Sequence, residues 1–194
     1  MKQTDVPTIW QHLPFLRGYP VPYFVAWEQS PEIGKTPLFH LADGRKWVTC
    51  LKYKKCWVCG KELKGPNFML TGPKGLKNKV GTDSFMHEAC ARESLRLCPH
   101  MLYQKTARRD PDSDKITFSP HHDLNKPTEI ALVKAGAFQI VHTGLTHVIN
   151  YQPLAVQWFF YVDGVLTAKT DAPERVDSSG CKRNGFKVVP ITKL

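Results

Sequence analysis

The stretch Cys56-Trp57-Val58-Cys59-Gly60 decides the fold, together with its downstream counterpart His87-Glu88-Ala89-Cys90. Each stretch carries two metal-binding residues separated by two others, and 27 residues (60–86) lie between the two pairs. Zinc prefers thiolate sulfur and imidazole nitrogen in a tetrahedron, and four protein ligands leave no open position for a substrate. The spacing therefore predicts one structural Zn²⁺, with a ligand set that consists of Cys56, Cys59, His87 and Cys90.

The residues around the ligands predict how the chain presents them. A C-x-x-C turn points both thiolates to one side, and Gly60 can adopt the positive φ that such a knuckle needs. His87 and Cys90 stand at positions i and i+3, so they share one face if a helix begins there. A knuckle, an intervening hairpin and a helix that carries the second pair would form a treble-clef-like zinc module.

Other interpretations of these cysteines stay open. A C-x-x-C pair alone would also suit a redox pair in a reducing compartment, and free cysteines are often simply buried. Cys98 and His100 compete as zinc ligands, because Cys98 lies two turns further along the same helix as Cys90. We interpret Cys98 as a core residue and Pro99 as the residue that ends this helix.

Further motifs accompany the ligand pairs. The knuckle, Gly72-Pro73, Asn78, His87-x-x-Cys90-Ala91 and Cys98-Pro99 together resemble an uncharacterised family of phage and bacterial proteins. The stretch 17–27 also resembles the opening of that family, so the resemblance covers about residues 17–102. The sequence departs from the family at Lys74, Lys79, 84–86 and His100, where the family has Met, Arg, Pro-Pro-Ser and Phe. The resemblance implies a phage origin and a shared zinc module, and it implies no activity.

Composition excludes several classes of protein. A chain of 194 residues with 42% hydrophobic and 23% charged residues is ordinary for a soluble globular protein with one core, or one core and a small zinc module. No apolar run approaches the length of a membrane span, and the first residues lack the apolar core of a signal peptide. Without an export signal, six cysteines favour metal binding and burial over disulfides. We expect a cytoplasmic protein of a bacterial host cell.

The formal net charge of +10 is concentrated in one part of the chain. Residues 44–79 carry ten basic side chains and one acidic side chain, Glu62. A concentrated basic surface beside a zinc knuckle suits a phosphate backbone or an acidic protein face, although it can also be merely solvated. The candidate residues for binding a nucleic acid or a partner are Arg45, Lys46, Lys52, Lys54, Lys55, Lys74, Lys77 and Lys79.

Local patterns predict three segments: an N-terminal arm with short strands (1–42), a zinc-binding segment with flanking helices (43–107) and an antiparallel β region (108–194). Aromatic residues such as Trp10 should pin the arm to the body. Strands are expected at 23–27 and 38–41, with a turn-rich connection at 28–35. In the second segment we expect a helix over 44–54 that is capped by Asp43, a strand at 67–71, a turn at 72–75 and a helix over 87–97.

The last third is rich in β-branched and aromatic residues. Strands are predicted at 128–133, 137–142, 147–151 and 156–162, and Asp163-Gly164 predicts a two-residue hairpin turn. A solvated loop at 108–115, a short helix at 172–179 and an edge strand at 186–190 complete the expectation. The fold class that follows is α+β, a treble-clef-like zinc module packed with a mainly antiparallel sheet.

The sequence favours binding over catalysis. A nuclease of the ββα-metal type needs a free general-base histidine and an open metal, whereas His87 is used as a ligand here. No paired carboxylates accompany the other histidines at 121, 122, 142 and 147, and no nucleotide or hydrolase motif is present. We expect a phage-type accessory protein that binds nucleic acid or a nucleic-acid-bound host machine. The alternatives are a phage inhibitor that docks on a host defence protein and a metal-dependent nuclease.

Overall fold

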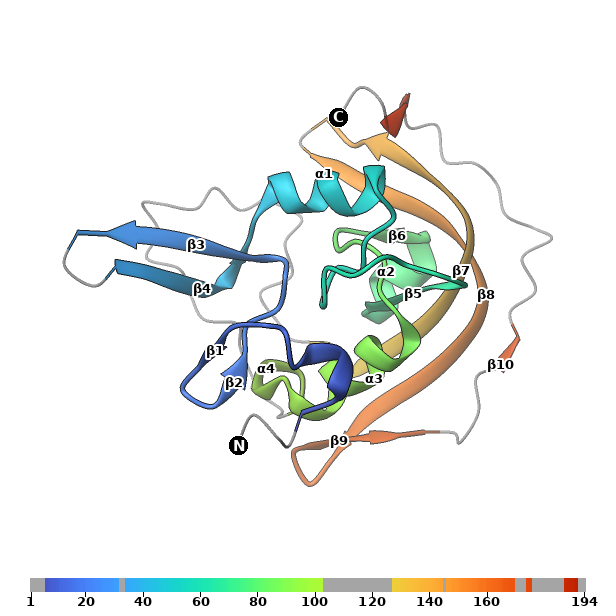
Figure 1. Ribbon diagram of the computed structural model, residues 1–194. Helices are drawn as coiled ribbons and strands as arrows, with labels where there is room; N and C mark the ends of the chain where they lie inside the picture. The colour runs from blue at the N-terminus through green and yellow to red at the C-terminus, as the bar shows by residue number, and fades with distance from the viewer. Residues whose placement is uncertain are drawn as a thin grey trace.

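The two longest strands of the structure form one antiparallel hairpin. The computed structural model describes residues 6–31, 34–102, 127–144, 146–169, 174–175 and 187–191. The hairpin consists of β7 (Glu129–His142) and β8 (His147–Val162), and it curves around the elements that precede it in the chain (Figure 1). Helices and mainly antiparallel strands are combined, so the α+β prediction is confirmed.

Five short strands extend this hairpin into a seven-stranded sheet, and every pairing is antiparallel. β7 pairs with β5 (Asn67–Thr71) and with β11 (Lys187–Val189). β8 pairs with β6 (Val80–Gly81), β9 (Val165–Ala168) and β10 (Glu174–Arg175). The segment between the two ligand pairs therefore shares one sheet with the C-terminal region.

The curvature of the hairpin has a local cause. Its register shifts between Lys134 and Ala135 and again between Ala135 and Phe138. Such bulges bend a strand and increase its twist. Pro153, which has no N–H to donate, lies opposite Ala135 at this irregular point. The sequence predicts four strands, with a break in each limb here, whereas both strands continue through the bulges and only two are formed.

The C-terminal expectations have mixed outcomes. Asp163 and Gly164 both have positive φ (49° and 78°) and join β8 to β9, so the predicted two-residue turn is confirmed. β11 confirms the edge strand that was expected near the C-terminus. The helix predicted at 172–179 is wrong at 174–175, which form β10, and its other residues lie outside the described ones, as does the loop predicted at 108–115.

The helices lie between the hairpin and the N-terminal region (Figure 1). They are α1 (Gly44–Lys52), α2 (Pro73–Asn78), α3 (Glu88–Leu97) and α4 (Pro99–Leu102). Asp43 caps α1 as predicted, with its carboxylate accepting a hydrogen bond from the Arg45 N–H at 2.9 Å. The turn predicted at 72–75 is wrong, because Pro73 opens α2 at a position where its missing N–H costs nothing. α3 ends at Leu97 as expected, with Cys98 as its C-cap, and Pro99 then begins α4.

The N-terminal region contains two separate two-stranded ribbons. A short 3₁₀ helix, η2 (Thr8–Trp10), precedes β1 (Phe15–Leu16) and β2 (Tyr19–Pro20). The second ribbon pairs β3 (Val25–Ser30) with β4 (Gly34–Ala42) and projects away from the curved hairpin (Figure 1). The predicted connection at 28–35 is therefore wrong at most of its positions, since the strands run to Ser30 and resume at Gly34.

Buried residues form two adjoining clusters. One surrounds the knuckle and includes Trp10, Trp57, Phe68 and Met86. The other packs α1 and β5 against the inner face of the hairpin, and it includes Met69, Ile149 and Tyr151. Among the described residues, no helix has the length and apolar character that crossing a membrane requires.

The strands between the two ligand pairs differ from the expected treble-clef hairpin. β5 pairs with β7 and β6 pairs with β8, with α2 between them in the chain. Single bridges, Lys55 with Glu62 and Phe68 with Met86, hold the ends of this segment near the knuckle. The long hairpin thus supplies the pairing that a treble clef would make within itself.

Candidate metal centre

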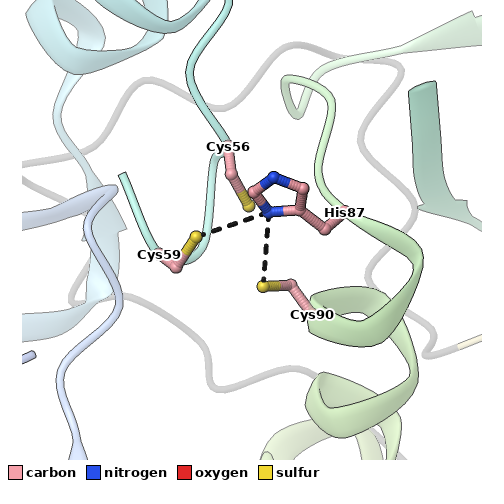
Figure 2. A group of neighbouring side chains, drawn as sticks. All are labelled: Cys56, Cys59, His87 and Cys90. Carbon is pink, nitrogen blue, oxygen red and sulfur yellow. Dashed lines mark hydrogen bonds between the residues drawn. The ribbon is translucent and has the colours of Figure 1, made fainter. Parts of the chain in front are cut away.

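Four side chains from two parts of the chain converge at the knuckle. Cys56 and Cys59 lie in the turn that follows α1, whereas His87 is the N-cap residue of α3 and Cys90 lies in its first turn. One ligand atom from each residue can be chosen so that all four lie within 4.8 Å of one another (Figure 2). The three cysteines are at most 1% exposed. The structure therefore brings together the predicted ligand set.

The distances suit a tetrahedral metal ion. Nδ1 of His87 lies 3.5 Å from Sγ of Cys59 and 3.8 Å from Sγ of Cys90. With Zn–S near 2.3 Å and Zn–N near 2.0–2.1 Å, a tetrahedron has S···N edges of about 3.6 Å. Three thiolates and one imidazole fill all four positions, so the donor set fits a structural zinc ion. A metal held this way would cross-link the knuckle to α3.

Backbone hydrogen bonds shape the knuckle. The Gly60 N–H donates to the Cys56 carbonyl at 2.8 Å, and the Cys56 N–H donates to the Lys61 carbonyl at 2.8 Å. Gly60 has φ of +71°, as the sequence predicted for this position. A Cβ at Gly60 would lie 2.7 Å from Cδ2 of Tyr23, so glycine is required for the close approach as well as for the φ angle.

The orientation of His87 is fixed by its second ring nitrogen. Nε2 lies 2.9 Å from the Glu62 carbonyl oxygen, which can only accept, so Nε2 carries the proton. Nδ1 is then left as the acceptor that faces the sulfurs. Such outer hydrogen bonds fix the tautomer and orientation of metal-binding histidines.

The N-terminal arm adds two contacts that the sequence did not reveal. Nε1 of Trp10 donates to Sγ of Cys90 at 3.2 Å, and Trp10 is 3% exposed. Nε2 of His12 donates to the Cys59 carbonyl at 2.8 Å. The sequence indicated only that aromatic residues would hold the arm to the body. Trp10 was expected only to pin the arm, and no sequence signal pointed to its bond with Cys90 or to His12, because the partners lie 80 and 47 positions away.

When only protein groups act on them, the three cysteine thiols differ in how readily they lose a proton. Hydrogen bonds from the Cys59 and Cys90 thiols lower the pKa of Cys56. Conversely, the same hydrogen bonds to Cys56 raise the pKa of Cys59 and Cys90, and burial adds to this rise. One thiolate is thus favoured and two are opposed. A bound cation is the ordinary means by which proteins hold three adjacent thiolates.

The alternative ligands stand apart from this group. Cys98 is the half-buried residue at the end of α3, and His100 in α4 is exposed. Neither belongs to the group of convergent ligand atoms that the described residues form. The cysteines at 50, 56, 59, 90 and 98 are all free of disulfides, and Cys181 lies outside the described residues.

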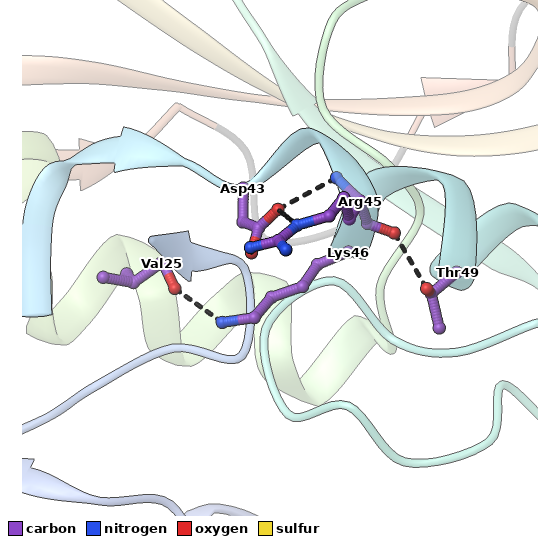
Figure 3. A network of polar contacts seen from close by, with 5 residues as sticks. All are labelled: Val25, Asp43, Arg45, Lys46 and Thr49. Carbon is purple, nitrogen blue, oxygen red and sulfur yellow. Dashed lines mark hydrogen bonds and ion pairs between the residues drawn. The ribbon is translucent and has the colours of Figure 1, made fainter. Parts of the chain in front are cut away.

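The predicted basic residues occupy different environments. Five of the eight have exposed side chains, namely Arg45, Lys52, Lys54, Lys74 and Lys77, and three are half-buried, namely Lys46, Lys55 and Lys79. The Nζ of Lys46 donates a hydrogen bond to the Val25 carbonyl at 2.6 Å (Figure 3). Arg45 contacts Asp43 through both carboxylate oxygens at 3.3 Å. These two side chains therefore have intramolecular partners.

The remaining histidines are spread over the chain. His142 and His147 face each other across the end of the β7–β8 hairpin, with ring centroids 4.9 Å apart. Nδ1 of His142 accepts a hydrogen bond from the Gly144 N–H at 3.1 Å. Residues 121 and 122 lie outside the described ones.

Comparisons of the chain with protein family models, with curated proteins and with solved structures find no match.

Proposed function

We propose that the chain is a binding protein in which a structural zinc ion stabilises a surface for nucleic acid. The observation behind this proposal is a set of exposed lysines on α1, on α2 and in the segment between α1 and the knuckle. Lys52 is the last residue of α1, Lys54 lies between α1 and the knuckle, and Lys74 and Lys77 lie on α2. Phosphate backbones bind such side chains largely through the release of counterions, which requires little shape complementarity.

Few acidic side chains accompany these lysines in the sequence. Glu62 is the one acidic residue in 44–79, and its Oε2 lies 3.5 Å from Nζ of Lys64. Asp43, just before α1, is held by Arg45. The closed ligand set of the metal centre supports a structural role for zinc, since no position is left for a substrate. Under this proposal the protein acts in the bacterial cytoplasm as a phage accessory protein, in keeping with its resemblance to that family.

Charge reversal tests the proposal. A variant with Lys52, Lys54, Lys74 and Lys77 replaced by glutamate should lose most of its affinity for DNA or RNA while its zinc content and thermal unfolding stay close to wild type. Exposed lysines add little to stability, whereas each phosphate contact contributes about 0.7–0.9 to the slope of log K against log salt. Wild-type binding with an unchanged salt slope in this variant would refute the proposal.

A second candidate, an inhibitor that docks on a host protein, is favoured by one observation. A cleft of about 520 Å³ lies between the arm, β4 and the α3–α4 junction, with a mainly apolar lining that includes Tyr19, Phe24, Phe39 and Leu97. Phe39 at its edge is 48% exposed. Capture of a host protein that survives nuclease treatment and is lost in Phe39→Asp, but not in the charge-reversed variant, would support this candidate over the first.

A further inference from the structure

A separate cavity of about 360 Å³ lies beside the metal knuckle. Its walls come from four parts of the chain: the N-terminal arm, β3, the first turn of α1 and the knuckle. The size falls at the lower end of the range of about 300–1,000 Å³ that is typical of ligand sites. The cavity is therefore large enough for one small ligand or for one unit of a polymer.

Three basic side chains line this cavity, and no carboxylate from the described part of the chain does. They are His12 from the arm, Lys46 from α1 and Lys61 from the knuckle. Two acidic residues adjacent in sequence to the lining lysines have other partners, because Asp43 is bound by Arg45 and Glu62 contacts Lys64. An anion entering the cavity would meet two lysines, and the one carboxylate that acts on Lys46, Asp43, is already paired with Arg45.

Two aromatic rings, Tyr23 and Trp27, also line the cavity, and a lysine lies over each. Nζ of Lys46 is 5.5 Å from the centre of the Tyr23 ring, and Nζ of Lys35 is 5.4 Å from the Trp27 ring. Burial lowers the pKa of Lys46, and the nearby charges of Lys35 and Arg45 act in the same direction, whereas Asp43 opposes them. Several cations are thus gathered around two ring faces. This combination matches a ligand with a phosphate and a planar base.

The walls are fixed in advance by hydrogen bonds. Lys46 is tied to the Val25 carbonyl at 2.6 Å (Figure 3), and His12 is tied to the Cys59 carbonyl at 2.8 Å. The Tyr23 N–H donates to the Val58 carbonyl at 2.7 Å, which holds the ring against Gly60. A site with positioned side chains loses less conformational entropy when it binds.

We propose that this cavity binds one nucleotide unit, with Lys46 and Lys61 at the phosphate and Tyr23 and Trp27 at the base. This inference rests on the proposed nucleic-acid function and specifies which form of nucleic acid the protein prefers. A base can enter the cavity only if it is unstacked, so the preferred ligand is a single strand rather than a duplex. Free nucleotides share the same chemistry, and the test separates these two sources.

The test uses the zinc-loaded full chain with three probes: an oligothymidylate of about ten nucleotides, a duplex of equal length, and thymidine 5′-monophosphate. Trp27→Leu should weaken oligothymidylate binding roughly 5- to 150-fold, the range for loss of one base stack, and Trp27→Phe should restore most of it. Lys61→Glu should weaken binding more than the matched reversal Lys64→Glu, because Lys64 lies on the same exposed loop but outside the cavity lining. Zinc content and thermal unfolding verify that each variant folds.

The outcomes separate this inference from the proposed function. If Trp27→Leu weakens binding of both the oligonucleotide and the monophosphate, the cavity binds a nucleotide unit from either source. If it weakens binding of only one of these probes, that probe identifies the source. If Trp27→Leu and Lys61→Glu bind the oligonucleotide as wild type does while reversal of the α1 and α2 lysines abolishes binding, the cavity assignment is wrong and the proposed function stands. If neither nucleic acid nor nucleotide binds the wild type, both are overturned.

Discussion

Trp10 donates its indole N–H to the Sγ of Cys90 at 3.2 Å, although 80 positions separate the two residues in the chain. Both are almost fully buried. A hydrogen bond to a ligand sulfur delocalises part of the thiolate charge and fixes the orientation of the side chain. The N-terminal arm is therefore part of the outer shell of the metal centre.

Replacing Trp10 by phenylalanine should weaken zinc affinity about tenfold, because it removes the N–H donor and keeps most of the packing. Competition with a chromogenic chelator measures this affinity directly. Trp158→Phe is the matched control, since Trp158 packs against the second core cluster. Equal affinities in wild type and Trp10→Phe would mean that the arm only covers the site.

Much of the metal centre could be predicted from sequence because its information is local. Cys56 and Cys59 define the knuckle by their spacing, and His87 with Cys90 shares one turn at the start of α3. Asp43 likewise predicts the start of α1, and Asp163-Gly164 predicts the β8–β9 turn, since caps and tight turns depend on adjacent residues. These features follow from chemistry within a few positions.

The features that were missed depend on distant partners. β5 pairs with β7 rather than with β6, and that choice is made by residues more than 50 positions away. The bulges near Ala135 keep β7 continuous where local composition indicated a break. Pro73 was interpreted as a turn residue, yet the same residue is favourable at the first position of a helix. Sequence patterns alone do not decide between such alternatives.

Elemental analysis should find one zinc ion per chain, and Cys56→Ser should abolish it. Removal of a thiolate ligand leaves three donors and couples metal loss to unfolding of the surrounding core. Cys98→Ser is the control and should retain full zinc content, because Cys98 lies outside the convergent group. Zinc retained in Cys56→Ser, or lost in Cys98→Ser, would require a different ligand set.

Gly60→Ala should destabilise the protein by about 1–3 kcal/mol, because alanine is strained at a φ of +71° and its Cβ would collide with the Tyr23 ring. Gly44→Ala is a matched control in α1, where an added Cβ meets nothing within 4 Å. That substitution should be neutral or stabilising by up to about 1 kcal/mol. Chemical denaturation compares both, and equal effects of the two would contradict the knuckle geometry.

Tyr151 and Tyr161 provide a contrast in hydroxyl environments. Tyr151 is 2% exposed, and its hydroxyl has no hydrogen-bond partner among the described residues. The hydroxyl of Tyr161 instead donates to the Met101 carbonyl at 2.8 Å. Tyr151→Phe should therefore be neutral or stabilising at pH 7, whereas Tyr161→Phe should cost about 1 kcal/mol. Denaturant midpoints at fixed zinc concentration measure both changes.

Alkaline pH tests the same tyrosine from another direction. Burial raises the pKa of Tyr151 from 10.0 to about 12. The nearby Thr71 side chain acts in the opposite direction, although it does not form a hydrogen bond with the Tyr151 hydroxyl. The unfolded chain therefore loses this proton first as pH increases. The associated stability is fully present below pH 10 and falls by about 2–3 kcal/mol as pH approaches 12. Tyr151→Phe should reduce this alkaline loss of stability. If the free energies of unfolding of wild type and variant differ by a constant amount from pH 9 to 12, the Tyr151 hydroxyl is not desolvated.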